Sequence, residues 1–235
     1  MRTARLAVLV FLPFLAFSAC IIAIGPGATK GVHSSWGWSG RSGSGVSATQ
    51  TRLAEPFHAL RIEGCCNASV SIGTNQSVGI TADDNLIDDI TTEVKDGVLV
   101  ISMKDGTNDS FHVGPKASIV VAALDIVSIQ GSGDVDVQGL NCESFTAQIE
   151  GSGDLRVLGS ATKLKAGIEG SGDMDLSGLE TQDASVSIEG SGDVRVRCSA
   201  TLAASVSGSG DIDYSGSPSK TNISVSGSGN VRPVH

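Results

Sequence analysis

Five aspartates and one asparagine recur at a nearly constant interval in the C-terminal half of the chain, and they are its sharpest candidate for chemistry. They are Asp134, Asp154, Asp173, Asp193, Asp211 and Asn230. Each closes a Gly-Ser-Gly-Asp or Gly-Ser-Gly-Asn tetrapeptide, and the intervals between them are 20, 19, 20, 18 and 19 residues. If the repeats stack, the carboxylates line up about 4.8 Å apart. Like charges at that distance repel, so such a column must be solvated, hydrogen-bonded or bridged by cations.

Two interpretations of this aspartate column follow. Oxygen-rich turns bind calcium in β-rolls built from nine-residue repeats, so the column could be a calcium ladder. Alternatively, each Asp accepts hydrogen bonds from the Gly and Ser amides of its own tight corner, as Asp commonly does in turns. The second interpretation is favoured, because the Asp turn occurs once per 18–20 residues and Asn230 can make similar bonds. We therefore expect a structural turn ladder, no metal site and no bound cofactor.

The elements that position this column follow from the residues between the corners. Apolar and polar residues alternate on both sides of each corner, with the period of 2 that is typical of β-strands. The two strand patterns of most repeats are separated by a glycine: Gly139, Gly159, Gly178 or Gly216. A unit of about 19 residues with two short strands cannot bury a core alone, but stacked copies can. The sequence therefore predicts an all-β chain, a parallel β-helix or β-solenoid of about five coils over residues 131–233, right-handed by the usual crossover preference.

Aligned positions in the repeats also predict which side chains face inward and which face outward. The most regular apolar column, which we expect inside, is Ile149, Ile168, Ile188, Val206 and Val225. Two positions after each motif Asp or Asn, the sign of the charge alternates through Asp136, Arg156, Asp175, Arg195, Asp213 and Arg232. Opposite charges on neighbouring strands contribute about 0.2–1 kcal/mol each. The alternation supports the parallel register, and we interpret it as structural.

The repeats and the segment before them resemble a known bacterial family. The repeated Gly-Ser-Gly-Asp, the stretch DDNLIDDITTEVKDGVLVIS (83–102) and the closing YSGSPSKTNISVSGSGNV (214–231) are similar to the putative auto-transporter adhesin head domain, the GIN domain. The resemblance covers about residues 55–233. It implies a β-helical domain at the cell surface or envelope, without an established enzymatic activity. The adjacent Cys65 and Cys66 depart from the pattern that carries the resemblance.

The N-terminus has the form of an export signal. Two arginines precede an apolar run that ends at Ile24, so residues 1–24 are predicted to be a signal peptide, a lipoprotein signal or a membrane anchor. The segment LAFSAC ends in Cys20 and resembles a lipobox, in which the cysteine becomes a lipidated N-terminus. Lipidation of Cys20 is the leading hypothesis, with ordinary cleavage and an uncleaved anchor as alternatives. We therefore expect an exported chain, tethered to a membrane in the periplasm or at the cell surface.

The rest of the chain divides into a linker and one domain. Residues 25–52 are rich in Gly and Ser and lack periodicity, which predicts a flexible linker. Residues 53–235 are predicted to form a single β-solenoid domain, because the strand patterns of 53–130 lead straight into the repeat coils and cover one end of the stack. Within them, Asp96-Gly97 predicts a hairpin, and residues 83–90 predict a short helix or turn.

The net charge argues against two classes of ligand, and the cysteine spacing argues against one disulfide and against a metal site. The net charge of −9 argues against nucleic acids and anionic membrane surfaces as ligands. Besides Cys20, four cysteines remain whose pairing the sequence does not assign: Cys65, Cys66, Cys142 and Cys198. The last two should lie about three coils apart, or about 14 Å, which is too far for a disulfide. No histidine stands at ligand spacing from any of them, so a metal site built on them is not expected.

No catalytic constellation stands out. The histidines are scattered and have no Ser, Cys or Asp arrangement around them: His33, His58, His112 and His235. The evenly repeated carboxylates belong to the scaffold, which weakens the alternative of a polysaccharide-active β-helix enzyme with paired carboxylates. We expect a non-enzymatic exported envelope protein, a putative adhesin or protein-interaction module. Its partner is expected to be an envelope or surface protein, with self-association as a second option. A passive structural or scaffold role and a calcium-binding adhesion module are the alternative functions.

Overall fold

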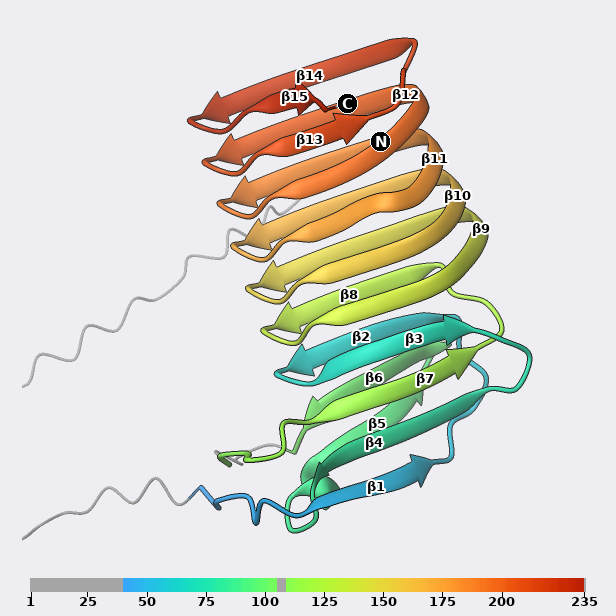
Figure 1. Cartoon of the computed structure of the whole chain (residues 1–235), viewed down its shortest axis with the longest axis vertical. Helices are drawn as coiled ribbons and strands as arrows, with labels where there is room; N and C mark the ends of the chain where they lie inside the picture. The colour runs from blue at the N-terminus through green and yellow to red at the C-terminus, as the bar shows by residue number, and fades with distance from the viewer. Residues whose placement is uncertain (1–39, 105–108, 235) are drawn as a thin grey trace, which may run out of the picture. The chain divides into compact units, whose positions relative to one another are not determined.

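The computed structural model describes residues 40–104 and 109–234, which belong to one compact unit built almost entirely of strands. Its elements are β1 (Ser47–Arg52), β2 (Ala59–Gly64), β3 (Asn67–Ile72), β4 (Ser77–Asp83), the 3-10 helix η1 (Ile87–Asp89), β5 (Ile90–Lys95), β6 (Val98–Met103), β7 (Lys116–Val121), β8 (Ile126–Gly131), β9 (Val135–Gly151), β10 (Leu155–Gly170), β11 (Met174–Gly190), β12 (Val194–Gly208), β13 (Ile212–Ser215), β14 (Lys220–Gly227) and β15 (Val231–Pro233). Parallel strands stack as a solenoid of about five turns (Figure 1). The predicted all-β solenoid is confirmed.

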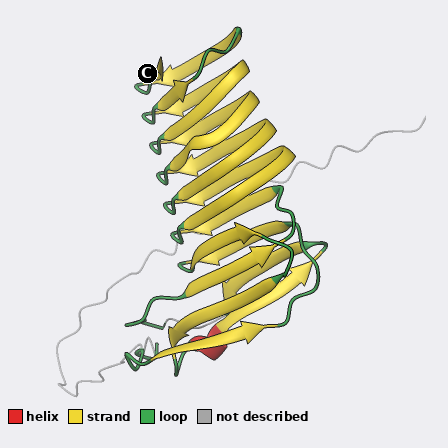
Figure 2. Ribbon diagram, turned by 45° about the vertical axis from the view of Figure 1, so that its right-hand side comes forward, coloured by secondary structure: helices red, strands yellow, loops and turns green. Residues whose placement is uncertain are grey.

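The chain winds back and forth between two faces of this solenoid (Figure 2). We call one of them the leading face. Its strands lie in the order β1, β4, β7, β3, the first halves of β9 to β12, β13 and β15, and from β3 onward they are the strands that follow the corners. The trailing face holds the strands that run into the corners: β5, β6, β2, β8, the second halves of β9 to β12, and β14. Like strand lies beside like strand, so that Leu155 pairs with Val135 on one side and Met174 on the other.

Within a coil, the strand is longer than the sequence predicts. β9 to β12 run for 17, 16, 17 and 15 residues, because pairing to the neighbouring coils continues round the bend with local register shifts. Gly139 and Gly159 lie at such bends with φ of 78° and 146°. Among the repeat coils of residues 131–233, two short strands per coil are therefore found only in the final one, where β13 and β14 are separate. The right-handed winding stays a prediction.

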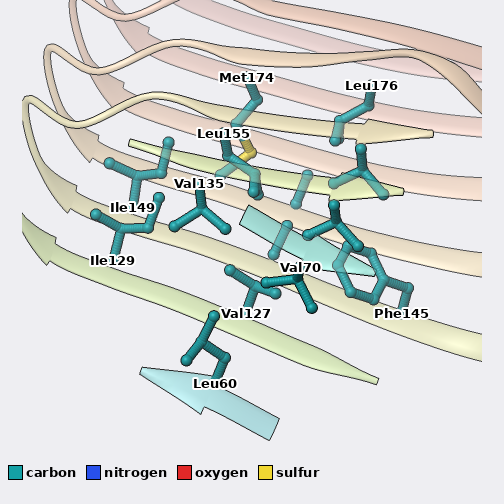
Figure 3. Packing of buried hydrophobic residues seen from close by; sticks show 14 of the residues in the cluster. Leu60, Val70, Val127, Ile129, Val135, Phe145, Ile149, Leu155, Met174 and Leu176 are labelled. Carbon is teal, nitrogen blue, oxygen red and sulfur yellow. The ribbon is translucent and has the colours of Figure 1, made fainter. Parts of the chain in front are cut away.

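Side chains from the two faces meet in one continuous apolar core (Figure 3). The inward column predicted from the sequence is confirmed over four coils, since Ile149, Ile168, Ile188 and Val206 are each 1% exposed. Its last member, Val225, is 43% exposed. No described strand lies on the far side of the final coil, so the expectation that the whole column is buried is wrong at this position.

The Gly-Ser-Gly-Asp corner is required by close stacking of backbone on backbone. The carbonyl oxygen of Gly131 accepts hydrogen bonds from the amides of Ser152 (2.8 Å) and Gly153 (3.1 Å) in the next coil. A Cβ atom on Gly153 would lie 2.2 Å from the carbonyl oxygen of Gly133, so no side chain fits there. The first glycine of the same corner, Gly151, has φ of 135°, a conformation that other residues rarely adopt.

A further corner of the same kind lies at Gly64–Asn67, one coil before the recognisable repeats. Gly64 pairs with Gly131, and the amide of Asp134 donates to Oδ1 of Asn67 at 3.0 Å. Cys65 takes the place of the serine and Cys66 that of the second glycine, where it is 3% exposed. The two cysteines that departed from the repeat are therefore part of a diverged copy of it.

The N-terminal end of the stack is covered by antiparallel strands. β1 pairs with β4, and β5 pairs with β6 through the predicted hairpin, in which Asp96 and Gly97 have φ of 51° and 77°. The short helix or turn predicted for residues 83–90 contains η1. β1 lies inside the predicted flexible linker of residues 25–52. The linker prediction is wrong for residues 47–52, because all six pair with β4.

Asp83 fixes the chain before β1 to this end. Its side chain is fully buried, with Oδ1 accepting from the amide of Gly45 (2.7 Å) and Oδ2 from the amides of His112 and Val113 (both 2.9 Å). Burial by itself would raise the pKa of this carboxyl, but the three hydrogen bonds lower the pKa below its ordinary value. Part of the segment before β1 is thus held by a buried carboxylate.

The predictions for the N-terminal segment lie outside the described residues. They are the signal or anchor of residues 1–24, the lipidation site Cys20 and the linker from residue 25 to residue 39. Within residues 40–104 and 109–234, no helix has the length and apolar character needed to cross a membrane.

Candidate binding face

The aspartate column forms a hydrogen-bonded ladder along the edge of the leading face. At every step, the amide of one motif residue donates to Oδ1 of the motif residue in the preceding coil. The donors and acceptors are Asp154 to Asp134 (3.2 Å), Asp173 to Asp154 (3.0 Å), Asp193 to Asp173, Asp211 to Asp193 and Asn230 to Asp211 (each 2.8 Å). The structure therefore brings together all the residues predicted for the column, and it adds Asn67 as the first step.

The partners of these carboxylates differ from the prediction. We expected each Asp to accept from the Gly and Ser amides of its own corner. Those amides bond instead to the preceding coil, as Ser171 does to the carbonyl oxygen of Gly151 at 2.8 Å. The reason is the parallel stacking, which presents the amides of each corner to the coil before it and so makes the ladder run between coils.

Asparagines stand at both ends of the ladder. Nδ2 of Asn230 donates to Oδ1 of Asp211 at 3.0 Å, and this bond is the main cause of a lowered pKa for Asp211. At the other end, Nδ2 of Asn67 lies 3.5 Å from Oδ2 of Asp134. Among residues 40–104 and 109–234, no group of three or more His, Cys, Asp or Glu side chains is placed to hold a metal ion. The calcium ladder thus gains no support from this geometry.

The column of alternating charge lies two residues further along each strand, in the predicted register. Arg156 pairs with Asp136 on one side and Asp175 on the other, and Arg195 continues the alternation beside Asp175. Nε of Arg156 lies 3.9 Å from Oδ2 of Asp175. A hydrogen bond from the Ser177 hydroxyl is the main cause that lowers the pKa of Asp175, and Arg156 adds to it.

The two columns line an open groove on the outer side of the leading face, with a volume of about 610 Å³. We call it the polar groove. Its charged and amide-bearing lining comprises Asn67, Asp134, Asp154, Asp173 and Asp193 from the ladder, Asp136, Arg156, Asp175 and Arg195 from the alternating column, and Lys116 of β7. The Arg156 side chain is 58% exposed. No aromatic side chain lines the groove within the described part of the chain, so it offers no stacking platform for a sugar ring.

One histidine contact was not visible in the sequence, because its partners are 67 residues apart. Nδ1 of His58 lies 2.9 Å from Oδ1 of Asp125, and both side chains are about half exposed. Burial, followed by the charge of Asp125, raises the pKa of Cys142. A raised pKa favours the protonated, less nucleophilic form of the thiol. His112 donates its amide to Asp83 and its charge also lowers the pKa of that carboxyl, and His33 and His235 lie outside the described residues.

The four cysteines of the described chain are free. Cys142 and Cys198 stand in one column, separated by Ala161 and Thr181, which are successive partners in the ladder. Burial, with a further contribution from its neighbour Cys65, raises the pKa of Cys66 to about 12. The thiol of Cys66 is therefore a packed side chain of the first corner, and its raised pKa favours the protonated form.

Comparison with known proteins agrees with this architecture. No curated protein matches the sequence. A crystal structure described as a putative adhesin from Bacteroides fragilis is 24% identical, with a TM-score of 0.70 over 83% of this chain and 100% of that chain. A structure from Parabacteroides distasonis described as a putative lipid binding protein is 20% identical, with a TM-score of 0.57 over 83% of this chain and 99% of that one.

These likenesses show a shared fold. The family whose sequence model matches residues 56–218 is described as the putative auto-transporter adhesin, head GIN domain. That match spans well over half of the chain and includes the coils that carry the polar groove. The chain therefore belongs to the GIN-domain family of putative adhesin heads.

Proposed function

We propose that this chain is a non-enzymatic adhesion module, exported and tethered to the envelope, that binds an envelope or surface protein through the polar groove. The family and the putative adhesins that share its fold support the adhesin assignment. The observation that carries the choice of surface is the pair of outward columns, one hydrogen-bonded from coil to coil and one of alternating charge. A partner meets donors and acceptors that are already fixed in place.

Preorganisation is the physical reason to favour this face. Ordering side chains on binding costs about 0.5–1.5 kcal/mol each, and ladder carboxylates already held by amides avoid much of that cost. Their Oδ1 atoms accept the ladder bonds, and Asp154, Asp173 and Asp193 are exposed, so a partner can reach these carboxylates. The exposed guanidinium of Arg156 adds donors of fixed geometry. The outer side of the trailing face also carries charges, such as the stacked Glu150, Glu169 and Glu189, but these carboxylates are of one sign and do not alternate with arginines.

A role without catalysis fits the described residues. The ladder carboxylates accept amide bonds at Oδ1, Asp175 lies beside Arg156, and these carboxylates repeat in every coil without forming one distinct cluster. Burial, followed by the charge of Asp125, raises the pKa of the Cys142 thiol. Polysaccharide cleavage and calcium-dependent adhesion thus lack a supporting site, and we propose neither.

The tether completes the proposal. The apolar run of residues 1–24 and the lipobox-like LAFSAC support export with lipidation at Cys20, or retention through the apolar segment. The chain joins the solenoid at its capped end, where Arg41 forms an ion pair with Asp109 at 3.0 Å. Anchored this way, the adhesion module would be attached by that end.

The test is capture of one partner by the full chain in detergent. Wild type, an Arg156→Gln/Arg195→Gln variant and a control Lys163→Gln/Lys165→Gln variant are immobilised and exposed to solubilised envelope proteins. Both variants remove two exposed positive charges, the first from the groove and the second from the trailing-face half of β10. We expect the same partner on wild type and control, with binding to the groove variant weakened at least about tenfold, or 1.4 kcal/mol. Equal capture by both variants, or none above bare resin, would refute the groove as the binding surface.

A further inference from the structure

The terminal strands at the two ends of the solenoid differ in polarity. At the capped end, β1 is the outermost strand of the leading face, and Gln50 and Arg52 lie over Ile80 and Val78 of β4. Both are polar and hydrogen-bonded: Gln50 Nε2 donates to Asp88 (2.8 Å), and Arg52 donates to the carbonyl oxygen of Ile87 (2.9 Å). A polar terminal strand is what a solenoid needs to end in water.

The opposite end has no such cover among residues 40–104 and 109–234. All eight residues of β14 are exposed, and β14 pairs with β12 alone. Ile223 is 44% and Val225 43% exposed, whereas Ala204 and Val206, which occupy the same columns one coil earlier, are 4% and 1% exposed. β14 thus presents an open backbone edge together with core side chains.

This edge also lacks the usual protection against pairing. Natural edge strands carry charges, prolines or bulges that prevent another strand from adding to them. From Thr221 to Gly227, β14 contains neither a charged residue nor a proline. β15, the terminal strand of the leading face, contains both Arg232 and Pro233. The unprotected edge is therefore confined to β14.

We propose that two copies of the chain associate end to end by antiparallel pairing of β14 with β14 about a two-fold axis near Ser224. This contact rests on the proposed adhesin function and adds a homophilic contact to the binding through the polar groove. Residues directly opposite each other in an antiparallel pair point to the same face. With the two-fold axis at Ser224, Ile223 lies directly opposite Val225 of the partner subunit, and Val225 lies directly opposite Ile223 of the partner subunit. Both apolar side chains leave water, and the trailing faces of the two copies join into one sheet.

The distribution of charge favours a second copy as the occupant. The chain has a net charge of −9, yet residues 214–234 contain Lys220 and Arg232 and no Asp or Glu. Two copies therefore meet through their least acidic ends. Arg232 is neutralised by Asp213 at 2.7 Å. The two Lys220 side chains would stand eight positions apart along the paired strands, at about 26 Å, so they do not repel strongly.

Head-to-tail stacking is the competing arrangement, and the capped end argues against it. In head-to-tail stacking, β14 would meet β5, the terminal strand of the trailing face at the capped end, and would bring Ile223 and Val225 against a strand that carries the charged Glu93 and Lys95. Burying such polar groups beside apolar side chains costs free energy unless their hydrogen bonds are kept. The two-fold arrangement instead covers apolar surface with apolar surface, and it closes at two copies.

The two-fold arrangement has a consequence for the tethers. The leading face is ten strands deep, so the capped end and the β14 end are about 43 Å apart. In the dimer, the capped ends of the two copies point in opposite directions. One strand and two apolar side chains make a small interface, which is typical of weak, transient contacts. Many such contacts between two surfaces add through avidity, so the arrangement suits a link between two membranes.

The test uses the full chain in two formats. Sedimentation in detergent from about 10 µM to about 1 mM reports dimers, and light scattering of proteoliposomes reports vesicle clustering. Val225→Lys places a charge in the β14 edge at a site that is already 43% exposed, and Thr49→Lys places the same charge on the exposed side of β1 at the capped end. We expect wild type and Thr49→Lys to dimerise and to cluster vesicles, and Val225→Lys to weaken dimerisation at least about tenfold and to abolish clustering. Thermal melting checks that both variants are folded.

Each other outcome overturns the proposal. A monomer at every concentration with no vesicle clustering removes self-association. Filaments or open-ended oligomers that Thr49→Lys also disrupts would show head-to-tail stacking, and a dimer indifferent to Val225→Lys would place the contact elsewhere. Failure of the dimer proposal can be distinguished from failure of the groove proposal, because Arg156→Gln/Arg195→Gln should leave the dimer intact. Loss of partner capture by that variant, in turn, says nothing about β14.

Discussion

Asp83 shows how much one buried carboxylate can organise. It accepts three amide hydrogen bonds that join the segment before β1 to the segment after residue 111. We predict that Asp83→Asn lowers the melting temperature, because the amide offers one acceptor oxygen where the carboxylate offers two. The exposed neighbour Asp84 provides the control, and Asp84→Asn should melt close to wild type.

The pH dependence of the same residue has a defined sign. The folded-state pKa of Asp83 lies below the unfolded value, which is about 3.9. Its contribution to stability is therefore constant above about pH 4 and is lost as the pH falls through the lower folded-state pKa. Melting curves from pH 7 to pH 2 should show a steeper acid loss for wild type than for Asp83→Asn. Parallel curves would mean that Asp83 is not the group responsible.

The aspartate ladder predicts indifference to calcium. Each ladder carboxylate already receives an amide N–H at Oδ1, and no metal-binding cluster is present among the described residues. Millimolar calcium should leave the melting temperature within the shift given by matched sodium ionic strength, and chelator should have no effect. Asp173→Asn should be mild, because Asn67 and Asn230 occupy equivalent positions. A calcium-specific rise of several degrees would reverse this account of the ladder.

Among the elements, the corners tolerate the fewest substitutions, because a Cβ atom on some of their glycines would collide with the backbone of a neighbouring coil. Gly153→Ala would put a Cβ atom 2.2 Å from the carbonyl oxygen of Gly133, and the backbone of two coils would have to separate. We predict a loss of at least about 2 kcal/mol in the free energy of unfolding. Gly167→Ala, in the same strand-and-corner repeat, meets only Ser187 Oγ at 3.5 Å and should be within about 1 kcal/mol of wild type. Equal denaturant midpoints for the two variants would contradict the stacked-corner geometry.

Repetition explains which elements could be predicted from the sequence. The inward isoleucines and the alternating Asp136, Arg156 and Asp175 recur in every coil, so alignment of the repeats predicts both register and sidedness. β1 has no repeated counterpart, and its polar sequence resembles a linker until β4 supplies a partner. The corner at Cys65 was hidden because its cysteines replace serine and glycine. The ladder partners were missed because the sequence does not show whether an Asp bonds within its corner or to the next coil.

In the molecule as a whole, a capped end and an open end give the solenoid a direction. The chain joins at the capped end, and the proposed anchor at Cys20 would hold that end to the membrane. We predict that Cys20→Ser abolishes fatty-acid labelling and either releases the protein from membranes or leaves an unprocessed precursor. Metabolic labelling with membrane fractionation measures both results. A mature N-terminus without lipid, beginning at another residue, would remove the lipoprotein proposal.

The central claim is that this chain makes surfaces adhere through the polar groove. The most direct measurement counts fluorescent proteoliposomes that stay bound to immobilised envelope fragments after washing, with vesicles lacking the chain as background. Wild type and Lys163→Gln/Lys165→Gln should be retained well above background, and Arg156→Gln/Arg195→Gln should lose at least about nine-tenths of that retention. Retention of wild-type vesicles no greater than that of bare vesicles would contradict the adhesin function itself.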